Sequence, residues 1–323
     1  MLKLKHLFEN YALAKTALAR WEHDKDTLDD MLSRFRISSN AIYPFRQNGA
    51  VCFLRLAPTD EKLARNVIGE LELIEYLIRN GFPALVPIPA KDGAVCLTLH
   101  TEWGDYYATA FRKVRGVQIE ATNYSNEMMV SYGKTLGRLH ALSADFIPTV
   151  AKWTHEDALD WIGEVLREYG ASGVMLAERD AISRELAALP RTYYGLVHYD
   201  FEPDNVFYDA ETNSCAVIDF DDGMYHWYAL DIEQVFASLA EELSGDSLEA
   251  AERAFLDGYR TQHAYTAEMD ALRPLMRRFI NLYTYARLTR SIAETFDDEP
   301  EWLTGLRVKL GSILTSIETG IRS

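Results

Sequence analysis

The sequence predicts an α+β fold of two lobes, a smaller antiparallel-sheet lobe followed by a larger, mostly helical lobe. Strand-like apolar runs dominate before Gly116, whereas amphipathic helical periodicity dominates after it. The chain has 323 residues, enough for about two lobes with cores of their own. We therefore expect one lobe at residues 1–115, with extra helices at its start, and a second lobe at residues 116–323.

The first lobe begins with helical sequence and continues with strands. Two helical pieces, around residues 4–21 and 27–34, precede the first strand. Runs rich in β-branched and aromatic residues predict four strands, at Ala41–Phe45, Val51–Leu56, Val95–Leu99 and Tyr106–Val114. A further helix is expected to open at Glu70 and to cover Glu70–Leu77.

The second lobe is helical except for short strands within residues 195–220. Apolar residues recur at helical spacing around them. The expected helices are Glu127–Leu142, Asp157–Tyr169, Val174–Leu189, Leu230–Leu243, Leu248–His263, Leu275–Thr295 and Glu301–Gly320. Gly137, in the first of these helices, is expected to permit close packing.

Composition restricts the function. With 33 basic and 49 acidic residues, the net charge of −16 argues against a nucleic-acid partner, because that binding depends on basic surface. The acidic excess serves solubility or attracts a cationic substrate. Cys52, Cys96 and Cys215 show no metal spacing, which is typical of a reducing, cytoplasmic setting. The N-terminal sequence lacks a signal-peptide apolar core, and no apolar run approaches the roughly 18 residues of a membrane span.

The most informative segment is His198-Tyr199-Asp200-Phe201-Glu202-Pro203-Asp204-Asn205, followed by Asp219. This His-x-Asp-x-x-x-x-Asn…Asp spacing is that of protein-kinase-like phosphotransferases. Phosphoryl transfer needs these three polar groups, one to orient a hydroxyl and two to hold magnesium on the phosphates. The competing interpretation is an acidic surface hairpin that matches by chance; the second acid at a strand end weakens it.

A predicted hairpin places the residues of the motif relative to one another. Residues 205–209 and 215–220 are predicted as paired strands joined by the turn-rich loop 210–214. If the hairpin is symmetric about Thr212, Asn205 lies opposite Asp219. Opposed residues have Cβ atoms about 4.5–5.5 Å apart, so their oxygens would converge on one cation, and an all-oxygen pair suits Mg²⁺. Asp200, on the preceding loop, is the expected general base.

On these residues the chain resembles the aminoglycoside phosphotransferase/choline kinase-like family, which has a protein-kinase-like fold, from about Ser38 through the late helices. In this family the catalytic loop commonly has the sequence His-Gly-Asp-Leu-His-Pro-Gly-Asn. Here Tyr199, Glu202 and Asp204 replace Gly, His and Gly, and these positions are expected on the acceptor side. The resemblance also implies that Asp231 braces the catalytic loop.

The resemblance implies ATP, or GTP, and Mg²⁺ as cofactors, with nucleotide binding in the first lobe and the acceptor site in the second. Arg55 stands where many kinases have the phosphate-contacting Lys, and Glu70 where the family places its acidic partner. Arginine can hold phosphate oxygens with a planar fork of donors. The alternative is a strand-edge charge and a solvated helix acid. The expected phosphate-covering turn is Ser38-Ser39-Asn40, and the expected adenine-contacting hinge contains Arg112, Lys113 and Val114.

Two clusters suggest opposite charges for the acceptor. Asp221 and Trp227 lie in a segment rich in acids and aromatics that would hold a cationic amine, with ordinary packing as the alternative. Tyr283, Arg287 and Arg290 fall on one helical face and would grip an anionic or hydroxyl-rich acceptor. His140, among apolar helix positions, is expected to be a core residue.

The expected activity is ATP- and Mg²⁺-dependent transfer of the γ-phosphate to a hydroxyl of a small-molecule acceptor. A Ser/Thr protein kinase is one alternative, disfavoured by the short stretch between Asp219 and Asp231. A nucleotide-binding pseudokinase with a regulatory role is another. Retention of all three catalytic polar residues argues against it.

Overall fold

The computed structural model describes residues 2–296 and 298–322, and the chain divides into two compact units. Unit 1 comprises Met1–Val67, Leu85–Lys113 and Arg287–Ser316, and unit 2 comprises Ile68–Ala84, Val114–Ala286 and Ile317–Ser323. Three helices, α3 (Ala64–Arg79), α9 (Ala267–Ile292) and α10 (Glu301–Arg322), contribute residues to both. The assignment of nucleotide and acceptor binding to separate lobes stays a prediction.

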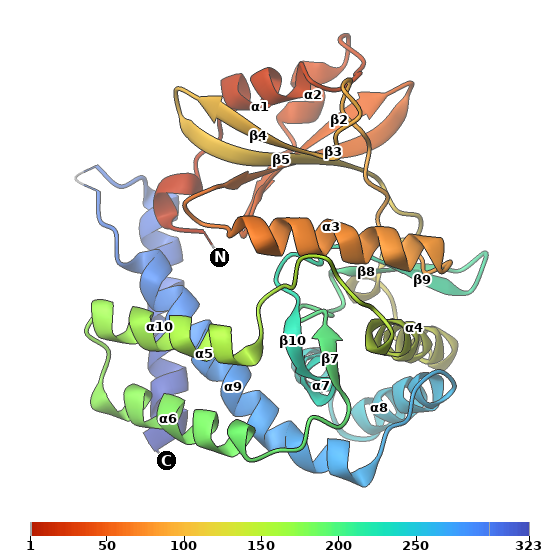
Figure 1. Cartoon of the computed structure of the whole chain (residues 1–323), viewed down its shortest axis with the longest axis vertical. Helices are drawn as coiled ribbons and strands as arrows, with labels where there is room; N and C mark the ends of the chain where they lie inside the picture. Colours follow the sequence, from red (N-terminus) through yellow and green to blue (C-terminus); the bar gives the residue numbers. More distant parts are fainter. Residues whose placement is uncertain (1, 297, 323) are drawn as a thin grey trace. The chain divides into compact units, whose positions relative to one another are not determined.

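Unit 1 is built on a five-stranded antiparallel sheet in the order β1-β2-β3-β5-β4. The strands are β1 (Arg36–Ile37), β2 (Ala41–Gln47), β3 (Ala50–Pro58), β4 (Cys96–Thr101) and β5 (Gly104–Arg112). A short 3-10 helix, η1 (Leu4–His6), opens the unit. The helices α1 (Tyr11–Leu18) and α2 (Leu28–Leu32) lie over one face of the sheet (Figure 1).

The two faces of β3 have different environments. Leu54 and Leu56 are fully buried in the core that α1 and α2 complete, together with Trp21. Successive side chains of a strand point to opposite faces. Arg55 therefore projects from the face that α1 and α2 do not cover.

Unit 2 is mostly helical, with two small antiparallel sheets. Its further helices are α4 (Asn126–Ala144), α5 (His155–Glu168), α6 (Gly173–Ala187), α7 (Ala229–Glu242), α8 (Gly245–Arg260) and the short η2 (Ile119–Ala121). One sheet pairs β7 (Tyr194–Val197) with β10 (Met224–Trp227), and the other has β6 (Val117–Gln118), β8 (Val206–Asp209) and β9 (Ser214–Val217) in the order β6-β8-β9. In Figure 1, β7 and β10 lie between α4 and α8 on one side and α5 and α6 on the other.

Helices α4 and α8 pack with their backbones in close approach. A Cβ atom on Gly133 would lie 1.8 Å from the carbonyl oxygen of Phe255, and one on Gly137 would lie 2.5 Å from that of Tyr259. Real Cβ atoms do not approach so closely, so both positions need glycine. The expectation that Gly137 permits close packing is confirmed.

The predicted fold class is confirmed, and the expected strands and helices are present with ends shifted by a few residues. Two boundaries are wrong by more. Helix α9 begins at Ala267 rather than at Leu275, because Pro274 lies inside the helix instead of before it. Helix α3 begins at Ala64, so Glu70 does not open the helix but lies in its second turn, fully buried. Asn66 and Gly69 are poor helix formers and hide the true start in the sequence. Residues 224–227, expected as part of a packed loop, form β10.

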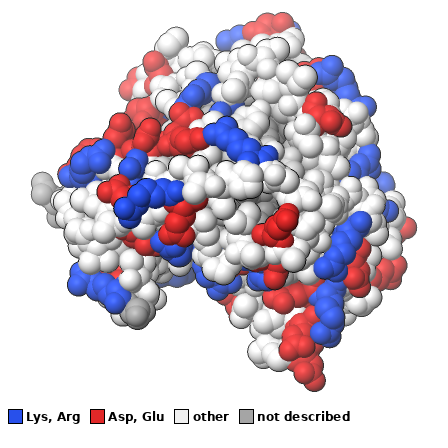
Figure 2. All heavy atoms as spheres, turned by 60° about the horizontal axis from the view of Figure 1, so that its bottom comes forward, with Lys and Arg blue, Asp and Glu red and all other residues white. Residues whose placement is uncertain are grey.

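Charged side chains of both signs are exposed on the face shown in Figure 2. Acidic and basic side chains are interspersed on the face shown in Figure 2, so the net charge of −16 forms no uniform patch there. Within residues 2–296 and 298–322, none of the helices is both long and apolar enough to cross a membrane.

The contact between α4 and α8 gives a stability prediction. Gly133→Ala forces a methyl group into the Phe255 carbonyl, and we expect it to lower the free energy of unfolding by about 3 kcal/mol or more, at the upper end of overpacking costs. Gly305→Ala in α10 is the matched control, because nothing lies within 4 Å of its added methyl group. That control should be neutral or stabilising by about 0.5–1 kcal/mol. Urea unfolding measures both; equal effects would contradict the packing argument.

Candidate active site

Asp231 on α7 holds the loop that contains the His198–Asn205 motif. Its Oδ2 accepts from the backbone N–H of His198 at 2.8 Å, and its Oδ1 accepts from that of Tyr199 at 2.8 Å. Its Oδ2 also accepts from Nε2–H of His140 at 3.0 Å. Both Asp231 and His140 are fully buried, so these three donors compensate a carboxylate removed from water. The expected bracing role of Asp231 and core role of His140 are confirmed.

Tyr199 adopts a left-handed backbone conformation, with φ of +67°. Glycine adopts this conformation without steric cost, which explains the glycine common at this position in the family. Here the conformation is fixed from both sides, because the N–H donates to Asp231 and the carbonyl accepts from Nε2 of Gln234. The Tyr199 ring is buried and packs edge-on against the Tyr283 ring, with centroids 5.0 Å apart.

His198 links the loop to the end of β9. Its Nδ1 accepts from the backbone N–H of Asp200 at 3.2 Å, and its Nε2–H donates to the carbonyl of Ile218 at 2.9 Å. These contacts assign the neutral tautomer with the proton on Nε2. Burial lowers the pKa of His198, which favours the same neutral form. His198 therefore fixes the backbone around Asp200.

Asp200 and Asn205 contact each other directly. The Nδ2 group of Asn205 donates to Oδ2 of Asp200 at 2.8 Å and to the Asp200 carbonyl at 3.1 Å. Asn205 is buried and Asp200 is half-buried. Because the amide N–H groups both face Asp200, the amide oxygen of Asn205 is the atom left to act as a ligand.

The hairpin after Asn205 differs in register from the expected one. Strand β8 pairs with β9 so that Asn205 lies opposite Ile218, whose N–H donates to the Asn205 carbonyl at 3.0 Å. The expected opposition of Asn205 and Asp219 is therefore wrong by one residue. The loop contains residues 210–213 rather than 210–214, and Asn213 closes it in the left-handed conformation with φ of +49°.

Asp219 follows β9 in a left-handed conformation of its own, with φ of +62°. This reversal, rather than strand opposition, sets the direction of its carboxylate. The donor set of an amide oxygen and a carboxylate fits a hard divalent cation such as Mg²⁺. Convergence of Asn205 and Asp219 on one cation stays a prediction.

Another group of ligand-type side chains lies in unit 1. Among the residues that the structure describes, His6, Asp60 and Glu61 bring ligand atoms within 4.8 Å of one another. Lys5 already pairs with Asp60 at 3.0 Å, and Arg290 pairs with Glu61 at 2.6 Å. These cations balance the two carboxylates, so we interpret the group as an ion-pair cluster.

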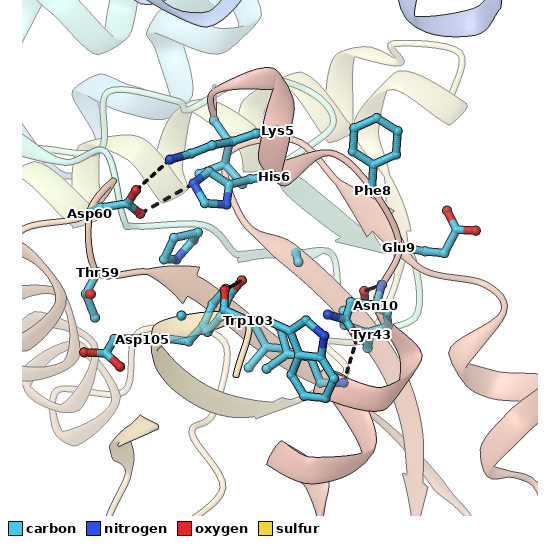
Figure 3. A pocket seen from close by; sticks show the side chains of 17 residues that line it. Lys5, His6, Phe8, Glu9, Asn10, Tyr43, Thr59, Asp60, Trp103 and Asp105 are labelled. Atoms are coloured by element: carbon cyan, nitrogen blue, oxygen red, sulfur yellow. Dashed lines mark hydrogen bonds and ion pairs between the residues drawn. The ribbon is translucent and has the colours of Figure 1, made fainter. Parts of the chain in front are cut away.

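The same part of unit 1 contains a pocket of about 760 Å³ (Figure 3). It lies between the segment that begins with η1 and the sheet, and Lys5, Asp60, Tyr43 and Leu56 are among its lining residues. Tyr43 and Leu56 belong to the core that α1 and α2 cover. Because Arg55 projects from the opposite face of the sheet, this pocket is separate from the predicted phosphate contact.

Arg55 is buried on β3, with 5% of its surface exposed. Its Nε–H donates to Oγ1 of Thr109 on β5 at 3.2 Å, and its guanidinium carbon lies 5.0 Å from the centre of the Phe111 ring. These contacts orient a permanent positive charge on the face of the sheet that α1 and α2 do not cover. Its contact with phosphate and its pairing with Glu70 stay predictions.

The predicted phosphate turn, Ser38-Ser39-Asn40, connects β1 and β2, and Asn40 is buried. Nη2 of Arg287 donates to Oγ of Ser39 at 3.1 Å. The structure thus brings together a residue predicted for phosphate and one predicted for the acceptor. Both roles stay predictions. Arg290, also predicted for the acceptor, pairs with Glu61, whose side chain is 2% exposed, and its acceptor role stays a prediction.

Two backbone amides of the predicted hinge donate hydrogen bonds to carbonyls of unit 1. The N–H of Arg112 donates to the carbonyl of Val86 at 2.9 Å, and that of Lys113 donates to the carbonyl of Val51 at 3.2 Å. A contact with adenine would therefore use other backbone groups of the segment that ends at Val114. That contact stays a prediction.

Trp227 is a core residue rather than an acceptor contact. Only 1% of its surface is exposed, and its indole N–H donates to the carbonyl of Pro190 at 2.9 Å. Its side chain packs on His155 and Tyr194. The sequence signal was misleading because an aromatic residue in a predicted loop looks exposed, whereas β10 turns it inward.

The other residues predicted for the acceptor lie in unit 2. Glu202, Asp204 and Asp221 are half-buried, and Gln118 donates to the carbonyl of Asp204 at 2.7 Å. The buried Tyr283 ring packs against Trp161 at 5.5 Å as well as against Tyr199. An aromatic cluster of Tyr199, Tyr283 and Trp161 therefore begins one residue before Asp200.

Lys152 belongs to no motif and was missed from the sequence. It is 2% exposed, and its Nζ donates to the carbonyls of Phe220 and Asp221, directly after Asp219. The signal was a lone lysine between Ala151 and Trp153, which resembles an ordinary surface charge.

Comparison with known proteins decides the family. The sequence profile described as "Phosphotransferase enzyme family" matches residues 36–275. The chain belongs to this family. It is a kinase that transfers a phosphoryl group to an alcohol acceptor.

Individual relatives are distant in sequence. Amicoumacin kinase of Bacillus subtilis (strain 168) is 23% identical over 239 residues, which cover 71% of this chain and 68% of that protein. Homoserine kinase of Sinorhizobium fredii (strain NBRC 101917 / NGR234) is 26% identical over 274 residues, with 78% of each chain covered.

Solved structures show the same fold. An amicoumacin kinase in complex with AMP-PNP and Ca²⁺ superposes with a TM-score of 0.78 at 18% identity, covering 98% of this chain and 95% of that chain. A microcompartment-associated aminopropanol kinase gives a TM-score of 0.73 at 19% identity, covering 97% of each chain. Members of this kinase family use a nucleotide and a divalent metal, in agreement with the contents of the first of these structures.

The buried histidines give a prediction for pH dependence. Burial lowers the pKa of His198 and lowers that of His226 well below its usual value. As the pH falls through the unfolded-state pKa of about 6.5, the unfolded chain binds protons that the folded chain does not. Stability should therefore fall with acidification from about pH 6.5, by at most about 1.4 kcal/mol per pH unit for each histidine.

Urea unfolding between pH 7.5 and 5.5 measures this slope. His100→Asn is the control, because the side chain of His100 is 77% exposed. Its ionic partner in the described chain is Asp105. This substitution should leave the slope unchanged. A free energy of unfolding that is flat over this range would contradict the neutral buried histidines.

Proposed function

We propose that the chain catalyses ATP- and Mg²⁺-dependent transfer of the γ-phosphate to a hydroxyl of a small-molecule acceptor. One observation carries the proposal. Asp200 and Asn205 are hydrogen-bonded to each other on a loop whose backbone Asp231 holds at two consecutive amides. A phosphoryl-transfer site needs a base and a metal ligand fixed at this kind of short separation.

Asp200 is the proposed general base. It is half-buried, and its Oδ2 accepts one N–H bond from Asn205. That bond orients the carboxylate, and an ionised carboxylate offers about four acceptor sites in all. His198 is not a competing base, because its two ring nitrogens are used by Asp200 N–H and the Ile218 carbonyl.

Asn205 and Asp219 are the proposed ligands of Mg²⁺, which when bound neutralises charge on the phosphates. In unit 1, Arg55 is the proposed phosphate contact, with Glu70 as its predicted partner. The Arg287–Ser39 contact supports a phosphate-binding role for the turn Ser38-Ser39-Asn40, because it adds a cation to hydroxyl and backbone donors.

The acceptor is proposed to carry an amine as well as a hydroxyl. Homoserine and aminopropanol, named in two relatives, both have these groups. In this chain, the Tyr199 and Tyr283 rings near Asp200 offer aromatic faces, and Glu202 and Asp221 offer carboxylates, for an ammonium group. A protein acceptor is disfavoured because residues 224–227 between Asp219 and Asp231 form β10, paired along its length with β7.

A screen for ADP release tests the activity. Purified protein with Mg·ATP should release ADP slowly alone and faster with one class among amino alcohols, sugars, amines and aminoglycosides. The matched control omits Mg²⁺, which should abolish the acceptor-dependent rate because the phosphate charge is then not neutralised. No binding of Mg·ATP at millimolar concentration would refute the proposal.

Asp200→Asn tests the base. We expect turnover to fall by about 10²–10⁴-fold, the usual contribution of general-base catalysis, while Mg·ATP binding is retained. Steady-state kinetics and calorimetric titration measure the two effects. Glu211→Gln is the control, because Glu211 is an exposed acid in the hairpin loop. Full turnover in Asp200→Asn would remove Asp200 as the base.

A further inference from the structure

A short stretch of unit 2, Thr149–Trp153, contacts both α3 and the segment that follows Asp219. We name it the bridging segment. It lies between α4 and α5 and contains the buried Lys152. A buried lysine is uncommon unless its charge is compensated, so the contacts of this side chain need an explanation.

On one side, the bridging segment is attached to α3. The carboxylate of Glu72 accepts from the backbone N–H of Thr149 at 3.0 Å and of Val150 at 3.2 Å, and the Thr149 hydroxyl also donates to it. One turn earlier on α3, a Cβ atom on Gly69 would lie 2.7 Å from Cγ of Lys152 and 2.8 Å from the Val150 carbonyl. The segment therefore packs against the α3 backbone itself.

On the other side, the bridging segment is attached to the residues after Asp219. Nζ of Lys152 donates to the carbonyl of Phe220 at 2.8 Å and to that of Asp221 at 2.9 Å. The carbonyl of Trp153 accepts from the N–H of Tyr225 at 2.7 Å. One ammonium group thus holds the two peptide groups directly after the left-handed turn at Asp219.

We propose that Lys152 is a positioning residue that fixes the metal-binding orientation of Asp219 and couples it to the position of α3. Asp219 has a left-handed backbone, so its carboxylate direction depends on how the next peptide groups are held. Hydrogen bonds from a charged donor are about twice as strong as neutral ones, which suits this task. The proposal rests on the proposed role of Asp219 as a ligand of Mg²⁺.

Removing Lys152 has two opposing effects on metal binding. Loss of a nearby positive charge strengthens cation binding, whereas loss of the two hydrogen bonds frees the backbone that directs Asp219. Groups that orient metal ligands typically change metal affinity by about 10–100-fold when removed. We infer that the orienting effect dominates, so the variant should bind metal more weakly.

Lys152→Met tests this inference, because methionine keeps the unbranched stem and removes the donor. Hydrogen exchange of a peptide covering residues 220–225, measured without ligand, should be faster than in the wild type. In titrations of Mn²⁺ into protein saturated with a non-hydrolysable ATP analogue, metal affinity should fall by about 10-fold or more. High metal concentration should restore turnover, which a residue that only stabilises the fold would not produce.

The matched control is Lys134→Met, which removes an exposed lysine of α4 in the same unit. It should change neither hydrogen exchange nor metal affinity. Gly69→Ala is a second variant, because it displaces the bridging segment and the stem of Lys152 but keeps the ammonium group. It should weaken metal binding in the same direction by a smaller factor, and it remains informative if Lys152→Met does not fold.

The outcomes separate the two proposals. If the wild type binds no metal with the ATP analogue, the proposed function fails. If the wild type binds metal and folded Lys152→Met binds it equally well or more tightly, the positioning role is overturned while the proposed function stands. If Lys152→Met does not fold, unchanged metal affinity in Gly69→Ala overturns the coupling to α3.

Discussion

The arrangement of the His198–Asn205 loop depends on one buried carboxylate. Asp231 has no exposed surface, and it is compensated by the amides of His198 and Tyr199 and by the ring of His140. Burying an ionised carboxylate is costly without such donors, so the loop amides and Asp231 need each other. The same two amides fix the reversal at Tyr199 that precedes Asp200. The loop is thereby specified by a polar constraint from α7 rather than by apolar packing alone.

This constraint extends into the helices. His140 reaches Asp231 from α4, and its other ring nitrogen contacts the hydroxyl of Tyr259 on α8 at 2.8 Å. That reach is possible because α4 and α8 approach with glycine at Gly133 and Gly137. Networks of buried polar groups are stable only when each member is satisfied. Close helix packing and the position of Asp200 are therefore linked through side chains that do no chemistry themselves.

Features encoded in short stretches of sequence were predicted, whereas features that depend on residues remote in sequence were not. Periodicity located the strands and helices, and the apolar neighbours of His140 indicated its core role, because both signals are contained in short windows. The bracing role of Asp231 came from the family resemblance. The hairpin register failed at Asn205 and Asp219, since loop length is set by the left-handed residue Asn213 and one residue changes every pairing. The ion pair of Arg290 with Glu61 was not foreseen, because the two residues are remote in sequence. Lys152 was missed because the carbonyls that it holds are backbone groups, which leave no mark on residue identity.

Two residues of the candidate site have a strained, left-handed backbone. Tyr199 and Asp219 both have positive φ, which costs a non-glycine residue roughly 1–2 kcal/mol. Tyr199 directly precedes Asp200, and Asp219 follows Asn205 in the motif. Glycine would remove that cost at Tyr199, where the family commonly has it, but the aromatic contact with Tyr283 would be lost. The conformation is held by Asp231 and Gln234 whether or not a side chain is present. The ring of Tyr199 is thus not needed for the turn, and it packs instead against the Tyr283 ring beside the proposed base.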